Sequence, residues 1–137
     1  MAIINTFAKC LDSPYLHEDK DAPSGVPDLL ARAHERLGHA VKVQDAGQGD
    51  PADTVYLAYE SMYCSIRALV HAKGYRELGL RCLMLACESL YVRTGRLDVA
   101  LLHQFENAQR MKTSPAEAVS AAGSLLARAR EILSPGG

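Results

Sequence analysis

Apolar residues recur at three- and four-residue steps along most of this chain, which is the spacing of one face of an α-helix. Five such segments cover residues 28–46, 52–73, 76–92, 98–112 and 115–133. Capping and stop signals bound them: Asp50 stands before Pro51, Gly74 follows the second segment, and Ser114 forms a capping box with Glu117. Because no segment alternates polar and apolar residues, we expect no β-strand. The pattern therefore predicts an all-α protein, an antiparallel up-and-down bundle of four to five helices.

The start of the chain lacks this regularity. We predict an N-terminal extension or linker over residues 1–27 and a helical bundle over residues 28–137. Residues 2–11 favour a short helix, and the prolines and Gly25 that follow among charged residues indicate a surface loop. The start has no secretory-signal pattern, and no run of about 18 apolar residues occurs. We therefore expect a cytoplasmic protein that does not span a membrane.

The apolar stripes also predict the core and the oligomeric state. Six residues are expected inside the bundle: Met62, Ile66, Leu69, Leu83, Leu102 and Leu125. The segment 76–92 is apolar around most of its circumference. The preceding helix carries a wide apolar stripe with Tyr59 and Tyr63 at its edge. Because large apolar patches are rare on soluble monomers, we expect a twofold homodimer that covers both surfaces.

Composition narrows the class of protein without giving a function. The chain has 137 residues, a formal net charge of −1 and 48% hydrophobic residues, which suits one globular domain and excludes a disordered chain. Its 15 basic and 16 acidic side chains exclude nucleic-acid binding through bulk positive charge. This near-equality of basic and acidic side chains still allows a local basic cleft.

The cysteines and histidines form no metal or redox motif that we recognise. We interpret Cys10, Cys64, Cys82 and Cys87 as free thiols, and regard a disulfide or a reactive site as the alternative. No histidine follows a glutamate by three positions, as the ligands of a di-iron bundle would. We therefore predict neither a metal nor a cofactor.

A resemblance to a known family begins in residues 58–74, which read Ala58-Tyr-Glu-Ser-Met-Tyr-Cys-Ser-Ile-Arg-Ala-Leu-Val-His-Ala-Lys-Gly74. This segment resembles the central helix of HEPN-domain proteins, with an Ala-Tyr pair, a bulky apolar pair, small residues, Ala-Leu and a helix-ending glycine. The helix before it, with Leu30 and Glu35, fits the family's opening helix, and residues 107–133 are similar to its closing two helices. The resemblance covers about residues 28–133.

The resemblance implies a four- or five-helix bundle, usually a homodimer, that takes part in nucleotide or RNA transactions. Many members are toxins of toxin–antitoxin pairs or ribonucleases whose motif is Arg, four to six residues, then His. In that motif the arginine stabilises the charged phosphorane and the histidine is the general acid or base. Arg96 and His103 have this spacing at the start of the fourth helix. Arg32 and His39 have it too, but on the first helix, where the family does not place it.

Other members carry a tyrosine shortly after an arginine near the end of the fourth helix. Here Arg110 is followed by Met-Lys-Thr-Ser-Pro, so the tyrosine is missing and a toxin of that type is disfavoured. We expect any ligand or RNA cleft to lie near the dimer twofold, with Arg96, His103 and Arg110 at it.

A separate polar stripe lies on the second helix. Glu60 and Arg67 are seven positions apart, and Arg67 and His71 are four apart, so the three share one helical face. They form either a solvated charged face or the lining of a ligand-binding cleft.

These features leave three hypotheses open. We favour a non-catalytic regulatory module that binds a nucleotide, RNA or a protein partner. The first alternative is a ribonuclease that uses Arg96 and His103. The second is a helical adaptor with no small ligand.

Overall fold

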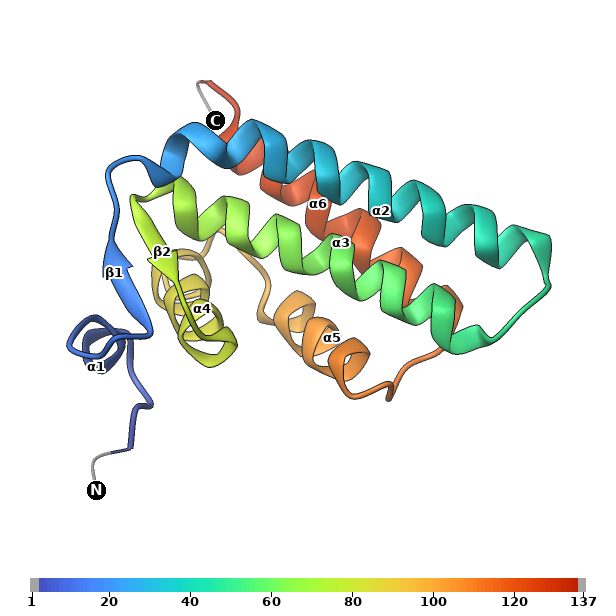
Figure 1. Ribbon diagram of the computed structural model, residues 1–137, viewed down its shortest axis with the longest axis horizontal. Helices are drawn as coiled ribbons and strands as arrows, with labels where there is room; N and C mark the ends of the chain where they lie inside the picture. The colour runs from blue at the N-terminus through green and yellow to red at the C-terminus, as the bar shows by residue number, and fades with distance from the viewer. Residues whose placement is uncertain (1–2, 136–137) are drawn as a thin grey trace.

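The computed structural model describes residues 3–135, and the protein is mostly helical, with 71% helix and 5% strand. Three long helices, α2 (Val26–Ala46), α3 (Pro51–Ala72) and α6 (Pro115–Leu133), lie side by side along the long axis (Figure 1). The shorter α4 (Leu80–Cys87) and α5 (Val99–Gln109) pack against α3. The predicted helical class is confirmed.

The helix ends follow the capping signals of the sequence. Asp50 accepts a hydrogen bond from the Ala52 N–H at 2.9 Å, so α3 begins at Pro51. Ser114 accepts one from the Glu117 N–H at 3.1 Å and starts α6. Gly74 follows α3 with a φ of +84°, a conformation that favours glycine. The predicted spans of α2, α3, α5 and α6 therefore hold within a few residues.

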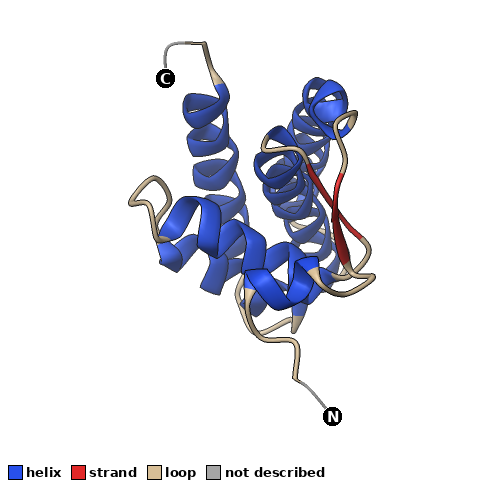
Figure 2. Ribbon diagram, turned by 90° about the vertical axis from the view of Figure 1, so that its left-hand side faces the viewer, coloured by secondary structure: helices blue, strands red, loops and turns tan. Residues whose placement is uncertain are grey.

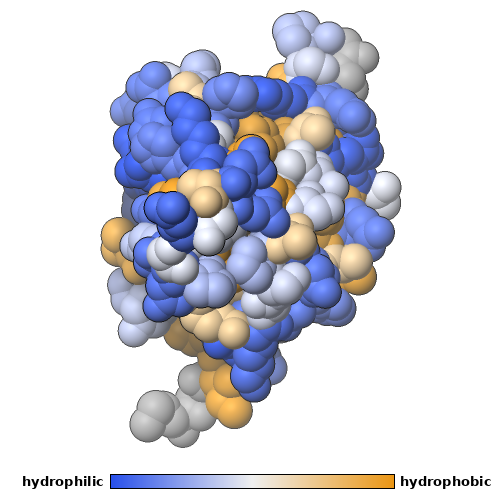
Figure 3. All heavy atoms as spheres, turned by 90° about the vertical axis from the view of Figure 1, so that its right-hand side faces the viewer, coloured by the Kyte–Doolittle hydropathy of each residue, from blue (hydrophilic) through white to orange (hydrophobic). Residues whose placement is uncertain are grey.

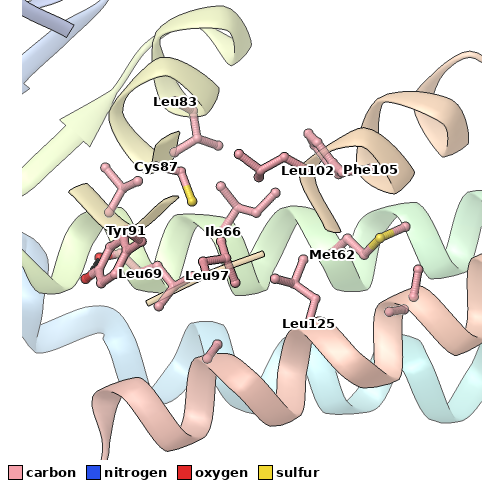
Figure 4. Packing of buried hydrophobic residues seen from close by; sticks show 14 of the residues in the cluster. Met62, Ile66, Leu69, Leu83, Cys87, Tyr91, Leu97, Leu102, Phe105 and Leu125 are labelled. Carbon is pink, nitrogen blue, oxygen red and sulfur yellow. Dashed lines mark hydrogen bonds between the residues drawn. The ribbon is translucent and has the colours of Figure 1, made fainter. Parts of the chain in front are cut away.

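The core forms where α3 meets α4, α5 and α6 (Figure 4). All six residues predicted for it are buried: Met62, Ile66, Leu69, Leu83, Leu102 and Leu125. Tyr91 and Phe105 add the two largest fully buried side chains. The Tyr91 hydroxyl donates to the Leu69 carbonyl at 2.5 Å, which satisfies its one polar atom. The helical stripes thus identified the correct inner faces.

The expectation of one helix over residues 76–92, and of no strand, is wrong. Residues Tyr75–Glu77 form strand β2, which pairs antiparallel with β1 (Leu16–Glu18). The helix α4 starts after Gly79, and its last turn widens into the π-helix η2 (Glu88–Val92). Because the partner strand is distant in sequence, a local periodicity pattern could not reveal the pairing.

The N-terminal segment is part of the bundle rather than a separate linker. It contains α1 (Phe7–Leu11), β1 and the 3-10 helix η1 (Ala22–Gly25), at the end of the bundle where β2 lies (Figure 2). The side chains of Cys10 and Leu16 are fully buried in the main core. The short helix expected within residues 2–11 is present as α1, whereas the surface loop expected after it is wrong at Leu16, which is buried. The predicted helix start at Ala2 lies outside the described residues.

The interpretation of all cysteines as free thiols is also wrong. Cys10 of α1 and Cys82 of α4 form a disulfide, with their Cα atoms 5.6 Å apart and their positions 72 apart in sequence. Cys64 and Cys87 are free and buried, as expected. Burial raises the pKa of the Cys87 thiol to about 12, so it stays protonated at neutral pH.

The end of the bundle away from the sheet is mostly hydrophilic, with apolar patches between the polar side chains (Figure 3). None of the helices described over residues 3–135 is both long and apolar enough to cross a membrane.

Candidate functional site

A concave surface lined by tyrosines and arginines lies between α2 and α3, which run side by side (Figure 1). It encloses about 380 Å³, and we call it the tyrosine–arginine groove. Its lining residues are Arg32, Arg36, Tyr56, Tyr59, Glu60, Tyr63, Cys64 and Arg67. Those from α3 mostly recur at three- and four-residue steps and those from α2 at four, so each helix contributes one face.

The tyrosines of the groove are held as an aromatic platform. Tyr59 stacks on the buried ring of Phe105, with centroids 5.1 Å apart and planes 11° apart. Tyr63 meets both rings edge-on. Tyr56 is 51% exposed at the open end. Burial raises the pKa of Tyr59 and of Tyr63, so both phenols stay neutral at physiological pH.

The groove also gathers positive charge, although the whole chain is slightly acidic. The Arg67 guanidinium lies 5.8 Å from the centre of the Tyr63 ring, within reach of a cation–π interaction. Arg36 is 3.7 Å from Glu60, the one carboxylate that lines the groove. Arg32 has no carboxylate within ion-pair distance over residues 3–135. Arg36 also contacts Glu35 at 3.3 Å and Arg67 pairs with Glu77 at 3.0 Å, so Arg32 supplies the uncompensated positive charge of the groove among residues 3–135.

A buried carboxylate fixes one end of this groove. Glu77 of β2 has 5% of its side chain exposed and lies between two residues of α3. Its Oε1 is 2.6 Å from Nε2 of His71, and its Oε2 accepts from Nε of Arg67 at 3.0 Å. Burial alone would raise the pKa of Glu77. The His71 hydrogen bond and the Arg67 charge outweigh it, so the pKa is lowered and the carboxylate stays ionised.

This network changes the interpretation of the polar stripe on α3. Glu60, Arg67 and His71 do share one face, but they are not all solvated, because only 2% of the His71 side chain is exposed. Glu60 and Arg67 line the tyrosine–arginine groove, and His71 lies beyond it. Sequence reasoning missed Glu77, since only the turn at Gly74 brings β2 back over α3.

A smaller cavity of about 180 Å³ continues the groove at the start of α2, and we call it the end pocket. It is lined by Gly25, Asp28, Leu29, Arg32, Arg67, His71 and Arg76, and so shares Arg32 and Arg67 with the groove. Arg76 of β2 donates from Nε to Asp19 at 2.7 Å. This hydrogen bond lowers the pKa of Asp19, with help from the backbone N–H of Asp21.

The residues proposed for catalysis lie elsewhere and apart. His103 and Arg110 line a cleft of about 430 Å³ between α4 and α5, together with Arg81, Glu88 and Glu106. Arg96 does not line this cleft. Its guanidinium donates to the Ile132 carbonyl at 3.3 Å, and lies over the Tyr91 ring at 5.9 Å. The structure thus brings His103 and Arg110 to one cleft but does not place Arg96 with His103 inside one chain.

Two further observations bear on chemistry. Among the described residues, no group of three or more His, Cys, Asp or Glu side chains is placed to hold a metal ion. Burial raises the pKa of the Cys64 thiol at the back of the groove, so that residue is not an activated nucleophile.

Comparison with protein-family models, with curated proteins and with solved structures gives no match for this chain.

Proposed function

We propose that this protein is a non-catalytic, HEPN-like helical module that binds single-stranded RNA in the tyrosine–arginine groove. The observation that supports this most directly is the combination of three tyrosines and three arginines on facing helices. Aromatic faces stack on unpaired bases of any sequence, and arginines neutralise the phosphates between them. The resemblance of residues 28–133 to HEPN domains points to the same class of ligand.

The charge distribution supports a local binding site. The net charge of −1 gives the protein no general affinity for polyanions. Attraction therefore depends on the groove, where Arg32 has no carboxylate within ion-pair distance in the described part of the chain and Tyr56 presents half of its surface. A rigid platform supported by Phe105 costs little entropy when a base stacks on it.

The first test is fluorescence anisotropy with a labelled single-stranded oligoribonucleotide of mixed sequence. We expect Tyr56→Ala to weaken binding roughly fivefold or more, since stacking on an aromatic side chain contributes about 1–3 kcal/mol per base. Arg32→Ala should weaken binding and also reduce the slope of log Kd against log salt by about 0.7, because one phosphate contact is lost.

Arg130→Ala is the matched control, because Arg130 is an exposed arginine on α6 outside the groove. It should bind like the wild type. Equal binding by the wild type, Tyr56→Ala and Arg32→Ala would contradict the proposal. Absence of RNA binding would favour the helical adaptor.

One observation supports the ribonuclease alternative. His103 is exposed in a cleft that Arg110 also lines. RNA cleavage by the purified chain that His103→Ala abolishes, and Arg130→Ala does not, would favour this alternative over the binding module.

We also propose that two copies pair through the cleft between α4 and α5. Leu80, Met84 and Val99 give this cleft an apolar floor. Its rims carry charges of both signs, which a twofold axis can bring opposite one another. Sedimentation equilibrium should give twice the 14.9 kDa mass of one chain at micromolar concentration. A single-chain mass would contradict the dimer.

A further inference from the structure

The arginines of the end pocket keep most of their hydrogen-bond donors free. Arg67 and Arg76 are each held through Nε, by Glu77 at 3.0 Å and by Asp19 at 2.7 Å. Their terminal Nη atoms have no hydrogen-bond partner among the described residues, and these are the donors that match a phosphate in pairs. The two carboxylates thus orient the guanidiniums without occupying them fully.

Two other features of the end pocket suit an anion. Arg32 lines it without a carboxylate partner in the described part of the chain. His71, almost fully buried, uses Nε2 for Glu77 and leaves Nδ1 without a partner among residues 3–135.

One lining residue opposes an anion. Asp28 lies in the first turn of α2 and is exposed to solvent, so its charge is screened by water. Against it stand three arginines that belong to three different elements, α2, α3 and β2. Because Glu77 and Asp19 already pair with two of these arginines, anion binding depends on the unpaired charge of Arg32 and on the free Nη donors of Arg67 and Arg76. The volume of about 180 Å³ accommodates one phosphate group.

We propose that the end pocket binds the terminal phosphomonoester of the RNA strand that lies in the tyrosine–arginine groove. This inference rests on the proposed function, because the shared residues Arg32 and Arg67 make the pocket the end of that groove. A terminal phosphomonoester carries about −1.5 to −2 charges at neutral pH, more than the single charge of an internal phosphodiester. A cluster of three guanidiniums at the end of the groove selects the more highly charged group.

The test compares three oligoribonucleotides of one sequence, with a 5′-phosphate, a 3′-phosphate or hydroxyl groups at both ends. We expect one of the two phosphorylated strands to bind about tenfold more tightly than the hydroxyl strand, the effect of one charged hydrogen bond. The end that gives the gain defines the direction in which the strand lies. Equal affinity of all three would overturn this inference and leave RNA binding intact. Binding of none would overturn both proposals.

Two variants of one ion pair locate the effect. Arg76→Ala removes a pocket arginine that does not line the groove, and Asp19→Asn breaks the same ion pair but keeps the arginine. Arg76→Ala should abolish the preference for the phosphorylated end and leave the affinity for the hydroxyl strand unchanged. Asp19→Asn should keep the preference. Loss of the preference in both variants would show that the preference depends on the Asp19–Arg76 ion pair rather than on a contact between Arg76 and the phosphate. That result would overturn the end pocket as the phosphate-binding site.

Discussion

Replacing Glu77 with alanine should lower the free energy of unfolding by about 3 kcal/mol at neutral pH, the scale for removing one partner of a buried ion pair. Only 5% of the Glu77 side chain is exposed, and its carboxylate is the common partner of His71 and Arg67. Its removal leaves the His71 ring without its hydrogen bond inside the protein. Urea unfolding followed by circular dichroism measures the loss.

The dependence of stability on pH provides a second readout of the same carboxylate. The hydrogen bond with His71 and the charge of Arg67 hold the pKa of Glu77 in the folded protein below its ordinary value. Its contribution to stability is therefore complete above the unfolded pKa and is lost as the pH falls through the folded pKa. We expect the wild type to lose more stability than Glu77→Gln between about pH 6 and the acid transition.

Glu18→Gln is the matched control, because Glu18 lies on the neighbouring strand β1 and is exposed. It should change the free energy of unfolding by less than about 0.5 kcal/mol. An equally small effect of Glu77→Ala would show that the buried network does not hold β2 to α3.

The helices could be predicted because each of them carries its own signals. The stripe from Val55 to Val70 and the caps at Asp50 and Ser114 are local features, and the structure confirms the helices that they define. Core positions followed from the same periodicity. Local patterns have this power because an amphipathic helix has only one apolar face to bury.

The N-terminal end could not be predicted for an equally physical reason. The pairing of β1 with β2 and the Cys10–Cys82 disulfide both join segments that are far apart in sequence. Three-residue strands are too short to show alternation. Cysteine spacing shows which residues are available for a disulfide but not which of them meet.

The candidate site was predicted in part. Glu60, Arg67 and His71 were correctly placed on one helical face. The sequence could not show that Glu77 would contact His71 and bury that end of the face. The tyrosines at 56, 59 and 63 share that face with Arg67, and this spacing was the available signal for the groove. By contrast, the spacing of Arg96 and His103 does not bring their side chains to one cleft.

Loss of the Cys10–Cys82 disulfide should have the largest effect on stability of any single covalent change. A cross-link between residues 72 apart removes much conformational entropy from the unfolded chain, and a stabilisation of about 4 kcal/mol is expected for a loop of this length. We expect the double variant Cys10→Ala/Cys82→Ala to unfold at a clearly lower urea concentration than the wild type. Adding dithiothreitol to the wild type should produce the same shift.

Cys64→Ala separates this effect from the loss of a buried thiol. Cys64 is buried but free, so this variant should still lose stability when dithiothreitol is added, whereas the double variant should not respond. Hydrogen exchange adds a local readout. In the reduced protein the amides of β1 should exchange faster, because β1 lies between the disulfide and the Asp19–Arg76 ion pair and loses its covalent anchor. Wild-type protein that unfolds identically with and without dithiothreitol would show that the disulfide does not stabilise the fold.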